Sequence, residues 1–330
     1  MKALVLGATG LLGANLVRAL LQKGYEVRAF KRKTSKTIGI AGLPIETAEG
    51  DVMNRDSISE ALKECQVLFH AGPYYPTLTI PVREAVGLGL TDVRNVMESA
   101  KQARIERVIY TSTLTTIGPP SRKGTLANED CAFQTRYTNN PYLVAKSAME
   151  DEVRRYAREG LPVVIVNPTA LLGPYDSRPS SGTQILMIAK HMMPAYIEGF
   201  TNVIDVRDVA MGMVLALERG RVGDRYILGH LNTNQSELNR MIARILGVSP
   251  PRIPVPYELA RWGSKFGEWT FTHILHKPPP VPGFFVEVLA QLQHYDCTKA
   301  VRELGLPQSP LENAIRDAVK WFREKGYLSA

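Results

Sequence analysis

The residues nearest the N-terminus predict a strand, a glycine-rich turn and a helix in direct succession. Residues 2–7 (KALVLG) are apolar and suit a buried strand, and residues 11–24 have helical periodicity ended by a glycine. Gly7, Gly10 and Gly13 lie at the turn between them. Glycines let the backbone approach a diphosphate, and a helix N-terminus offers unpaired N–H groups. The turn therefore predicts a dinucleotide site. Gly7 would form the tight turn, Gly10 the close approach and Gly13 the packing of helix on strand.

Strand-like and helix-like segments alternate through the first half of the chain. Further strands are expected at residues 25–30, 45–51, 66–72, 107–113 and 161–168, with long helices at about 82–103 and 142–159. Near-continuous apolar strands that alternate with helices indicate a parallel sheet covered on both faces, a Rossmann-type α/β fold. Two later strand-like segments, near residues 204 and 227, are expected to return to the same sheet.

The composition changes after Pro168, where proline and glycine become frequent, as in LLGPYDSRPSSG and HKPPPVPGFF. Such segments are loops, and loops carry specificity. We expect a nucleotide-binding domain in residues 1–170, with return segments near 201–229. Residues 171–200 and 230–330 would form a smaller, discontinuous substrate lobe. Residues 311–328 would close the molecule with an amphipathic helix.

Composition excludes several classes of protein. No apolar stretch of about 20 residues occurs, so no transmembrane segment is predicted. Cys65, Cys131 and Cys297 are far apart and odd in number, which is typical of reduced thiols in a cytoplasmic protein. The net charge is +8, but neither metal-ligand spacing nor a basic and aromatic nucleic-acid pattern is present. Neither a metal ion nor a nucleic acid is expected as a ligand.

Part of the positive charge lies at the position where a dinucleotide site distinguishes NADP from NAD. A site for NAD usually has an acidic residue about 20 residues beyond the glycine turn, at the end of the second strand. Here that place reads Phe30, Lys31, Arg32 and Lys33. Cations suit a 2′-phosphate, so the cluster predicts NADP(H). Asp51, after the third strand, would accept from the adenine amino group or cap the following helix.

Three residues of the first half suggest proton transfer. Thr113 ends the fifth strand, and Tyr142 and Lys146 follow at i and i+4 on one face of a helix. An ammonium near a phenol is expected to lower the pKa of Tyr142 toward neutrality. Tyr142 would then exchange a proton with a carbonyl/alcohol pair, with Thr113 bonded to the same oxygen. YxxxK alone also arises by chance on helix surfaces, but here it follows a glycine turn and a hydroxyl-rich strand end.

The motifs GATGLLG, YTST, YLVAK, VNPTALLGP and CTKAVRELG span nearly the whole chain. With them the chain resembles the extended short-chain dehydrogenases/reductases, in particular the dihydroflavonol 4-reductase-like and hopanoid-associated sugar epimerase-like groups. The resemblance implies a seven-stranded doubly wound sheet with a C-terminal substrate lobe. It also implies a Ser/Thr–Tyr–Lys set at Thr113, Tyr142 and Lys146, and a homodimer through helices 85–104 and 142–159. One departure is Gly89, which stands where the family run NVxGTxNV has its first asparagine.

These readings give a full set of predicted site residues. The cofactor is expected to contact Gly7, Thr9, Gly10, Leu11, Leu12, Gly13, Lys31, Arg32, Asp51, Val52, His70, Ala71, Gly72, Pro73, Thr111, Tyr142, Lys146, Asn167, Pro168 and Thr169. The residues expected above the sheet ends, facing the substrate, are Tyr74, Tyr75, Thr115, Thr169, Tyr175 and Phe200.

The substrate class is predicted from arginines that are missing. Nucleotide-sugar enzymes clamp a diphosphate, and sugar epimerases place one arginine before a DYIHVxD strand and another before SKAxxELG. Here Thr201 stands at the first place, and residues 282–300 contain no arginine. That stretch instead supplies Phe284, Phe285, Val286, Val288 and Leu289.

We therefore predict an NADP(H)-dependent oxidoreductase that interconverts a carbonyl and an alcohol on a mainly apolar small molecule. The alternatives are a nucleotide-sugar epimerase or dehydratase, with Arg178 or Arg252 as the clamp, and a catalytically silent NADP-binding sensor or scaffold. An apolar lobe on a basic chain would also suit a substrate drawn from a membrane surface.

Overall fold

The computed structural model describes residues 1–72, 74–75, 80–120, 122, 124–133, 139–274, 283–289 and 293–329. Its strands are β1 Lys2–Leu6, β2 Glu26–Lys31, β3 Glu46–Glu49, β4 Val67–His70, β5 Arg107–Thr111, β6 Val163–Pro168, β7 Ala170–Leu172, β8 Ala195–Ile197, β9 Phe200–Asp205, β10 Arg225–Leu228, β11 Leu231–Asn234 and β12 Ile253–Val255. Its helices are α1 Leu11–Gln22, α2 Arg55–Ala61, α3 Val82–Gln102, α4 Pro141–Arg158, α5 Thr183–Ala189, α6 Val206–Arg219, α7 Gln235–Leu246, α8 Tyr257–His273, α9 Gly283–Leu289 and α10 Leu311–Glu324. Short helical turns lie at Leu114–Thr116 (η1) and Ala300–Leu304 (η3).

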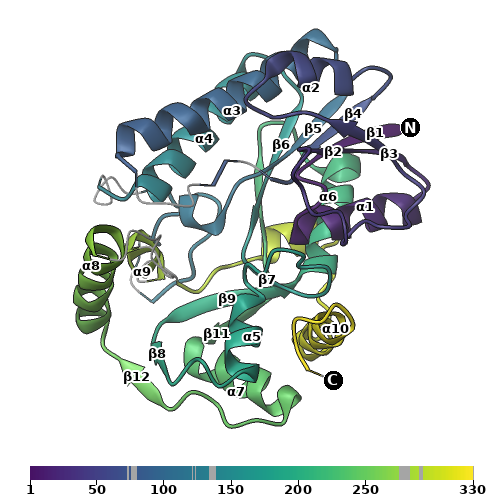
Figure 1. Cartoon of the computed structure of the whole chain (residues 1–330). Helices are drawn as coiled ribbons and strands as arrows, with labels where there is room; N and C mark the ends of the chain where they lie inside the picture. Colours follow the sequence, from purple (N-terminus) through teal and green to yellow (C-terminus); the bar gives the residue numbers. More distant parts are fainter. Residues whose placement is uncertain are drawn as a thin grey trace.

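The centre of the molecule is a seven-stranded parallel sheet in the order β10-β6-β5-β4-β1-β2-β3 (Figure 1). The chain moves outward from β1 to β3, then crosses back to place β4 on the other side of β1. Between β1 and β4 the strand order reverses, and in open α/β sheets ligands bind outside the carboxyl ends at such a point. The predicted doubly wound parallel sheet is confirmed.

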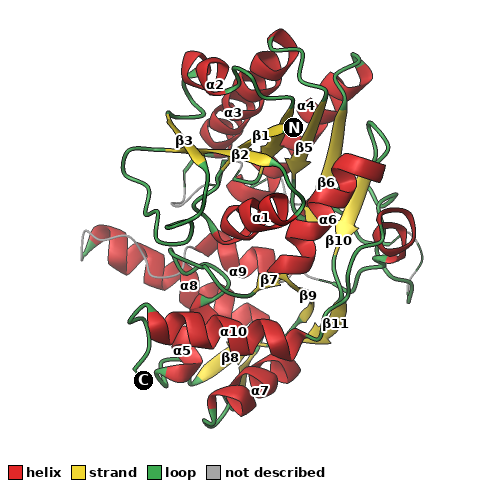
Figure 2. Ribbon diagram, turned by 90° about the vertical axis from the view of Figure 1, so that its right-hand side faces the viewer, coloured by secondary structure: helices red, strands yellow, loops and turns green. Residues whose placement is uncertain are grey.

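Both faces of this sheet are covered, as the apolar strands predict. In β1, Ala3 and Val5 pack into the core beneath α1 and α6, while Leu4 and Leu6 pack into the core beneath α2, α3 and α4. Figures 1 and 2 show these helix layers on opposite sides of the strands. The two cores hold the carboxyl ends of the strands in register, and that edge carries the predicted site.

The second half of the chain differs from the sequence prediction in two places. The segment near residue 227 joins the main sheet as β10, as expected, but the segment near 204 does not. It forms β9, which pairs with β7 and β11 in a separate three-stranded sheet. The place beside β6 is taken by β10, and β9 pairs with strands of the lobe instead. Residues 283–285, expected as the end of a loop, form the start of α9.

The lobe has a core of its own, in which α5, α7 and α10 pack against β7 and β9. Tyr175 and Trp321 contact each other at the border of this core, with ring centroids 6.3 Å apart. The proposed division at residues 170–171 stays a prediction, although β7 already belongs to the lobe sheet. Among the described residues, no helix is long and apolar enough to cross a membrane.

Candidate active site

The glycine turn has the geometry that a diphosphate cradle requires. Gly7 has a φ of +78°, which favours glycine, and a Cβ there would lie 2.7 Å from the backbone of Gly72. A Cβ on Gly13 would lie 2.1 Å from the Gly7 carbonyl oxygen, so only glycine lets α1 pack this closely on the turn. Gly10 is exposed and caps α1 with no side-chain hydrogen bond. The first N–H groups of α1 thus face outward beside a bare backbone.

The loop after β4 meets this turn at the point where the strand order reverses. The Ala71 amide donates to the Leu6 carbonyl at 3.0 Å, and Gly72 lies against Gly7. Ala71 and Gly72 are accessible, but the His70 side chain is fully buried and stacks on Tyr110 at 5.3 Å. The His70 ring faces the core, so the predicted contact of this loop with the cofactor would involve backbone atoms at His70. Pro73 lies outside the described residues.

The cationic loop after β2 lies at the same edge of the sheet. Lys31 is engaged by Glu49 of β3 at 2.6 Å, whereas the exposed Arg32 has no ion pair within the described ranges. Arg178, from the lobe, reaches the same loop, and its guanidinium donates to the Thr34 carbonyl at 3.1 Å. Two exposed guanidinium groups thus stand by the end of β2, and sequence analysis did not foresee the second.

Asp51 and Val52 follow β3 on the other side of this loop. Asp51 Oδ1 accepts from the Met53 amide at 3.0 Å, while no partner of Oδ2 is found in the part of the chain that the structure describes. The cap of α2 is Asn54, so Asp51 does not cap that helix. The Val52 carbonyl accepts from Asn95 of α3 at 3.0 Å. Asp51 Oδ2 is therefore the atom that remains for an adenine amino group.

Thr113 and Tyr142 meet as the sequence predicts. Thr113 Oγ1 lies 3.3 Å from the Tyr142 hydroxyl, and Thr115 Oγ1 lies 3.3 Å from Thr113 Oγ1. The sequence folds this way because Asn140 caps α4 and sets Tyr142 in its first turn. Burial raises the pKa of Tyr142, and the hydroxyls of Thr113 and Thr115 only partly offset this effect. The phenol is therefore protonated at neutral pH.

Lys146 lies one turn further along α4, with Nζ 5.9 Å from the centre of the Tyr142 ring. Its ammonium donates to the Tyr74 carbonyl at 2.5 Å. Burial lowers the pKa of Lys146 to about 8. The negative charge of Asp92 raises this pKa and offsets only part of the effect of burial. The expectation that Lys146 lowers the pKa of Tyr142 is wrong for this arrangement, because the ammonium faces Tyr74 and burial dominates at the phenol.

Asp92 of α3 is a site residue that sequence analysis missed. Its carboxylate is fully buried; Oδ2 accepts from the Tyr74 amide at 2.5 Å and Oδ1 lies 3.1 Å from His70 Nε2. The Tyr74 amide therefore donates to Asp92, and the Tyr74 carbonyl accepts from Lys146. Gly89, one turn earlier in α3, makes room for Met149 of α4, whose Sδ would lie 2.8 Å from a Cβ there. That contact explains the departure from the family pattern.

A second buried network positions Thr113 from beneath. Glu150 Oε2 accepts from Ser112 at 2.5 Å, from Thr116 at 2.6 Å and from Asn167 Nδ2 at 2.9 Å. Burial alone would raise the pKa of Glu150, but Arg225 and the two hydroxyls hold it below its usual value. Asn167 also donates to the Thr113 carbonyl at 3.1 Å. Its side chain is fully buried in this network, so the predicted contact of Asn167 with the cofactor would involve its backbone.

The remaining predicted contacts divide into two groups. Around the Thr113–Tyr142–Lys146 group lie Thr115, Tyr74 and Tyr75, the last with its ring 5.1 Å from Tyr142. Tyr175 and Phe200 lie away from this group. Tyr175 packs under the Arg18 guanidinium at 3.5 Å, and Phe200 packs on His294 at 4.6 Å. Of the other cofactor candidates, Thr9, Leu11 and Leu12 lie at the glycine turn, and Thr111, Pro168 and Thr169 end β5 and β6.

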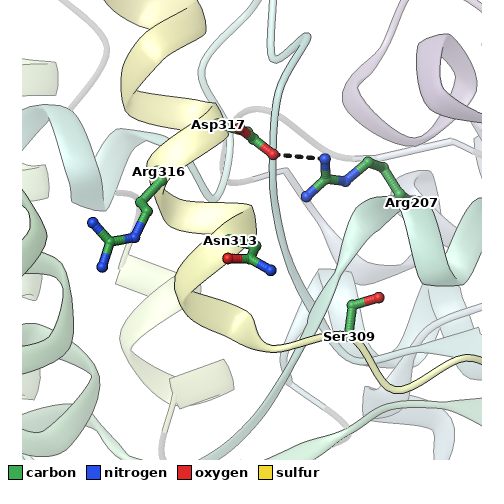
Figure 3. Close-up of a pocket in the computed structure, with 5 residues that line it drawn as sticks. All are labelled: Arg207, Ser309, Asn313, Arg316 and Asp317. Carbon is green, nitrogen blue, oxygen red and sulfur yellow. Dashed lines mark hydrogen bonds and ion pairs between the residues drawn. The ribbon is translucent and has the colours of Figure 1, made fainter.

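The structure also has a pocket of about 380 Å³ on another part of the molecule (Figure 3). It is lined by Arg207, Ser309, Asn313, Arg316 and Asp317, none of which the sequence predicts as a site residue. Arg207 pairs there with Asp317 at 2.6 Å and also with Asp205 at 2.6 Å. These ion pairs join the start of α6 to α10, so we assign the pocket a structural role.

Fold and site together define a Rossmann-type dinucleotide-binding protein with a Thr–Tyr–Lys group beside the cofactor cradle. A family model described as "NAD dependent epimerase/dehydratase family" matches residues 3–229. The chain belongs to this family, the extended short-chain dehydrogenases/reductases. The predicted class, an NAD(P)-dependent oxidoreductase of carbonyl and alcohol groups, is confirmed at this level.

Individual relatives cover the whole chain. A Synechocystis sp. protein named "Putative dihydroflavonol 4-reductase" is 38% identical over 98% of this chain and 95% of its own length. "Sterol demethylase protein B" of Methylococcus capsulatus is 32% identical over 99% of this chain and 100% of its own. The structure of a nucleoside-diphosphate-sugar epimerase from Pseudomonas aeruginosa superposes with a TM-score of 0.83, at 29% identity, over 100% of this chain and 99% of that one.

Proposed function

We propose that this protein is an NADPH-dependent reductase of apolar aldehydes or ketones. The observation that carries the proposal is the apolar wall beside Tyr142, where the Tyr75 ring lies 5.1 Å from the phenol ring and Val288 of α9 joins Tyr142 and Leu143 in one apolar cluster. A nucleotide-sugar would instead need cations for its diphosphate. Thr201 is buried, and Arg178 is directed at the cofactor loop. The wall therefore favours an apolar substrate.

The residues present fit a dinucleotide, since the contacts at Gly7 and Gly13 leave no room for a Cβ and keep the backbone bare. When bound, NADPH would supply the hydride. Tyr142, protonated because its pKa is raised, would donate a proton to the carbonyl oxygen as the alcohol forms. Thr113 would donate a hydrogen bond to the same oxygen, and the Lys146 ammonium, 5.9 Å from the centre of the Tyr142 ring, would be a cation beside the reacting group. A neutral phenol at rest favours the reductive direction.

Lys146 gives the proposed reaction a pH dependence. Its pKa is about 8, so its ammonium is present below that pH and lost above it. We expect kcat/KM to fall as pH rises through about 8. The variant Asp92→Asn removes the negative charge that raises the pKa of Lys146, so the fall should begin at lower pH. The variant also loses the charge-assisted hydrogen bond from the Tyr74 amide to the Asp92 carboxylate. This loss should reduce kcat/KM at pH 7 by about tenfold or more.

A pH series of kcat/KM for both enzymes would measure this shift. Asp130→Asn is the matched control, because it removes one carboxylate from an exposed loop. An alkaline limb at the same pH in Asp92→Asn and the parent would contradict the assigned role of Asp92.

Arg32 and Arg178 should select the cofactor. A charge-assisted bond to the 2′-phosphate contributes about 1.5–3 kcal/mol, which corresponds to roughly one to two decades in affinity. Arg32→Ala should therefore weaken NADPH by about 10- to 100-fold and leave NADH nearly unchanged. Fluorescence titration of both cofactors would test this, with Lys101→Ala, an exposed cation at the end of α3, as the control. Equal or tighter binding of NADH by the parent enzyme would contradict the NADP assignment.

A substrate panel tests the proposal as a whole. NADPH oxidation is expected with aromatic aldehydes, dihydroflavonols or 3-ketosteroids, and the last class is motivated by the relative named for sterol demethylation. UDP-glucose and UDP-galactose should neither bind nor interconvert. Clear epimerisation of either would favour the nucleotide-sugar alternative, which the family name and the Pseudomonas structure keep open. The proposal also includes a cytoplasmic homodimer formed through α3 and α4.

A further inference from the structure

Helix α8 has its largest apolar side chains on the outside of the molecule. Leu259, Trp262, Phe266 and Trp269 are spaced at i, i+3, i+7 and i+10, so they form one stripe along the helix. Their exposed fractions are 64%, 71%, 71% and 52%. Apolar stripes of helices in globular proteins normally face the core, so this orientation is the reverse of the usual one.

The opposite side of α8, which faces the protein, is partly buried and largely composed of small residues. Ala260, Ser264 and Gly267 lie there, with Phe271 at the end of the series. This side packs on α9. Figures 1 and 2 both place α8 at the outer edge of the molecule. Small residues thus seat the helix on the protein, and the aromatic side chains are left to face outward.

Helix α9 connects this surface to the reacting group. Its Val288 belongs to the apolar cluster of Tyr142 and Leu143, and its Glu287 accepts from Asn140 Nδ2 at 3.0 Å. Asn140 is also the residue that caps α4 in front of Tyr142. The exposed stripe is therefore one helix away from the catalytic tyrosine.

We propose that the stripe Leu259–Trp262–Phe266–Trp269 docks the protein on the surface of an anionic lipid bilayer. Helix α9 would then connect the docked helix α8 to the active site. Interfacial helices combine Trp, Phe and Leu on one face with Lys or Arg beside it. This stripe is flanked by Lys265 and by Arg261, which pairs with Glu258 at 3.2 Å. The chain as a whole carries a net charge of +8, which complements anionic headgroups. This inference goes beyond the proposed function, since binding to a bilayer requires no substrate.

Tryptophan fluorescence can report on docking directly, because the chain has three tryptophans and two lie on the stripe. Trp262 and Trp269 are exposed, whereas Trp321 is 4% exposed in the lobe core. With vesicles of phosphatidylcholine and phosphatidylglycerol, the full-length protein should float with the lipid. Its emission should shift to the blue and be quenched by brominated lipid. Vesicles of phosphatidylcholine alone should bind less protein.

The decisive variant is Trp262→Ser/Phe266→Ser/Trp269→Ser, which changes exposed side chains only. Its partition onto anionic vesicles should drop by on the order of tenfold or more. The control is Leu126→Ser/Met192→Ser/Val222→Ser, three apolar side chains exposed elsewhere, which should bind as the parent does. NADPH oxidation of a water-soluble aldehyde without vesicles should be equal in both. Failure of docking would leave that activity in place, so the two proposals can fail separately.

Two outcomes would overturn the inference. One is that the parent protein does not bind anionic vesicles, or binds them as well after the stripe is changed. The other is sedimentation of the parent as a dimer that the stripe variant converts to a monomer, because the stripe would then be covered by a second copy of the chain.

Discussion

Replacing Tyr142 with phenylalanine is expected to reduce turnover of a working substrate by about 100- to 10,000-fold, the usual contribution of a positioned acid or base. The Tyr142 phenol carries a proton at neutral pH and lies 3.3 Å from Thr113 Oγ1. Phenylalanine keeps the ring against Val288 and Tyr75, so cofactor affinity should hardly change. Steady-state kinetics and an NADPH titration would measure the two effects.

Tyr156→Phe is the matched control for that experiment. Tyr156 lies on the same helix, and its hydroxyl donates to Glu98 at 2.7 Å, away from the Thr113 network. Its loss should leave turnover nearly unchanged. Thr113→Ser should retain most of the activity because it keeps the hydroxyl, whereas Thr113→Val should lose it. A Tyr142→Phe enzyme that turns over at the parent rate would show that the proton comes from another group.

The fold was predictable wherever local pattern and burial agree. Strands β1 and β6 of the main sheet are buried on both faces, so their apolar runs are visible in the sequence. The error at β9 has a different origin. Both β9 and β10 contain short apolar, mostly buried runs, and such a run does not say which sheet the strand joins. That depends on which strand pairs with β6, a contact set by the whole topology.

The predicted site was correct for residues that lie at fixed distances along the chain. Tyr142 and Lys146 share a helix, and the glycines share one turn. Asp92 and Glu150 were missed because their partners come from other elements: Tyr74 and His70 for the first, Arg225 and Asn167 for the second. The lack of information on contacts between elements also explains why the direction of the pKa shift of Tyr142 was predicted incorrectly. Burial decides that pKa, and burial of a helix face cannot be read from YxxxK.

Replacing Gly13 with alanine is expected to damage both stability and cofactor binding. The new Cβ would lie 2.1 Å from the Gly7 carbonyl oxygen and 2.7 Å from Ala8 Cα, and neither backbone atom can rotate away. Helix α1 must therefore move off the turn, which takes its first N–H groups away from the diphosphate. Overpacking of this kind costs about 1–3 kcal/mol of the free energy of unfolding. NADPH affinity should fall by roughly one to two decades, the loss of one charge-assisted contact.

Gly87→Ala separates this clash from the general effect of alanine in a helix. Gly87 lies in α3, and a Cβ there would meet no atom within 4 Å. That variant should gain up to about 1 kcal/mol, because alanine is the better helix former. Gly13→Ala has the same propensity gain, so any net loss measures the contact with the turn. Thermal unfolding and NADPH titration of both variants would decide. If Gly13→Ala gained stability and bound NADPH like the parent, α1 would not be packed on the glycine turn, and the cradle assigned to the diphosphate would be wrong.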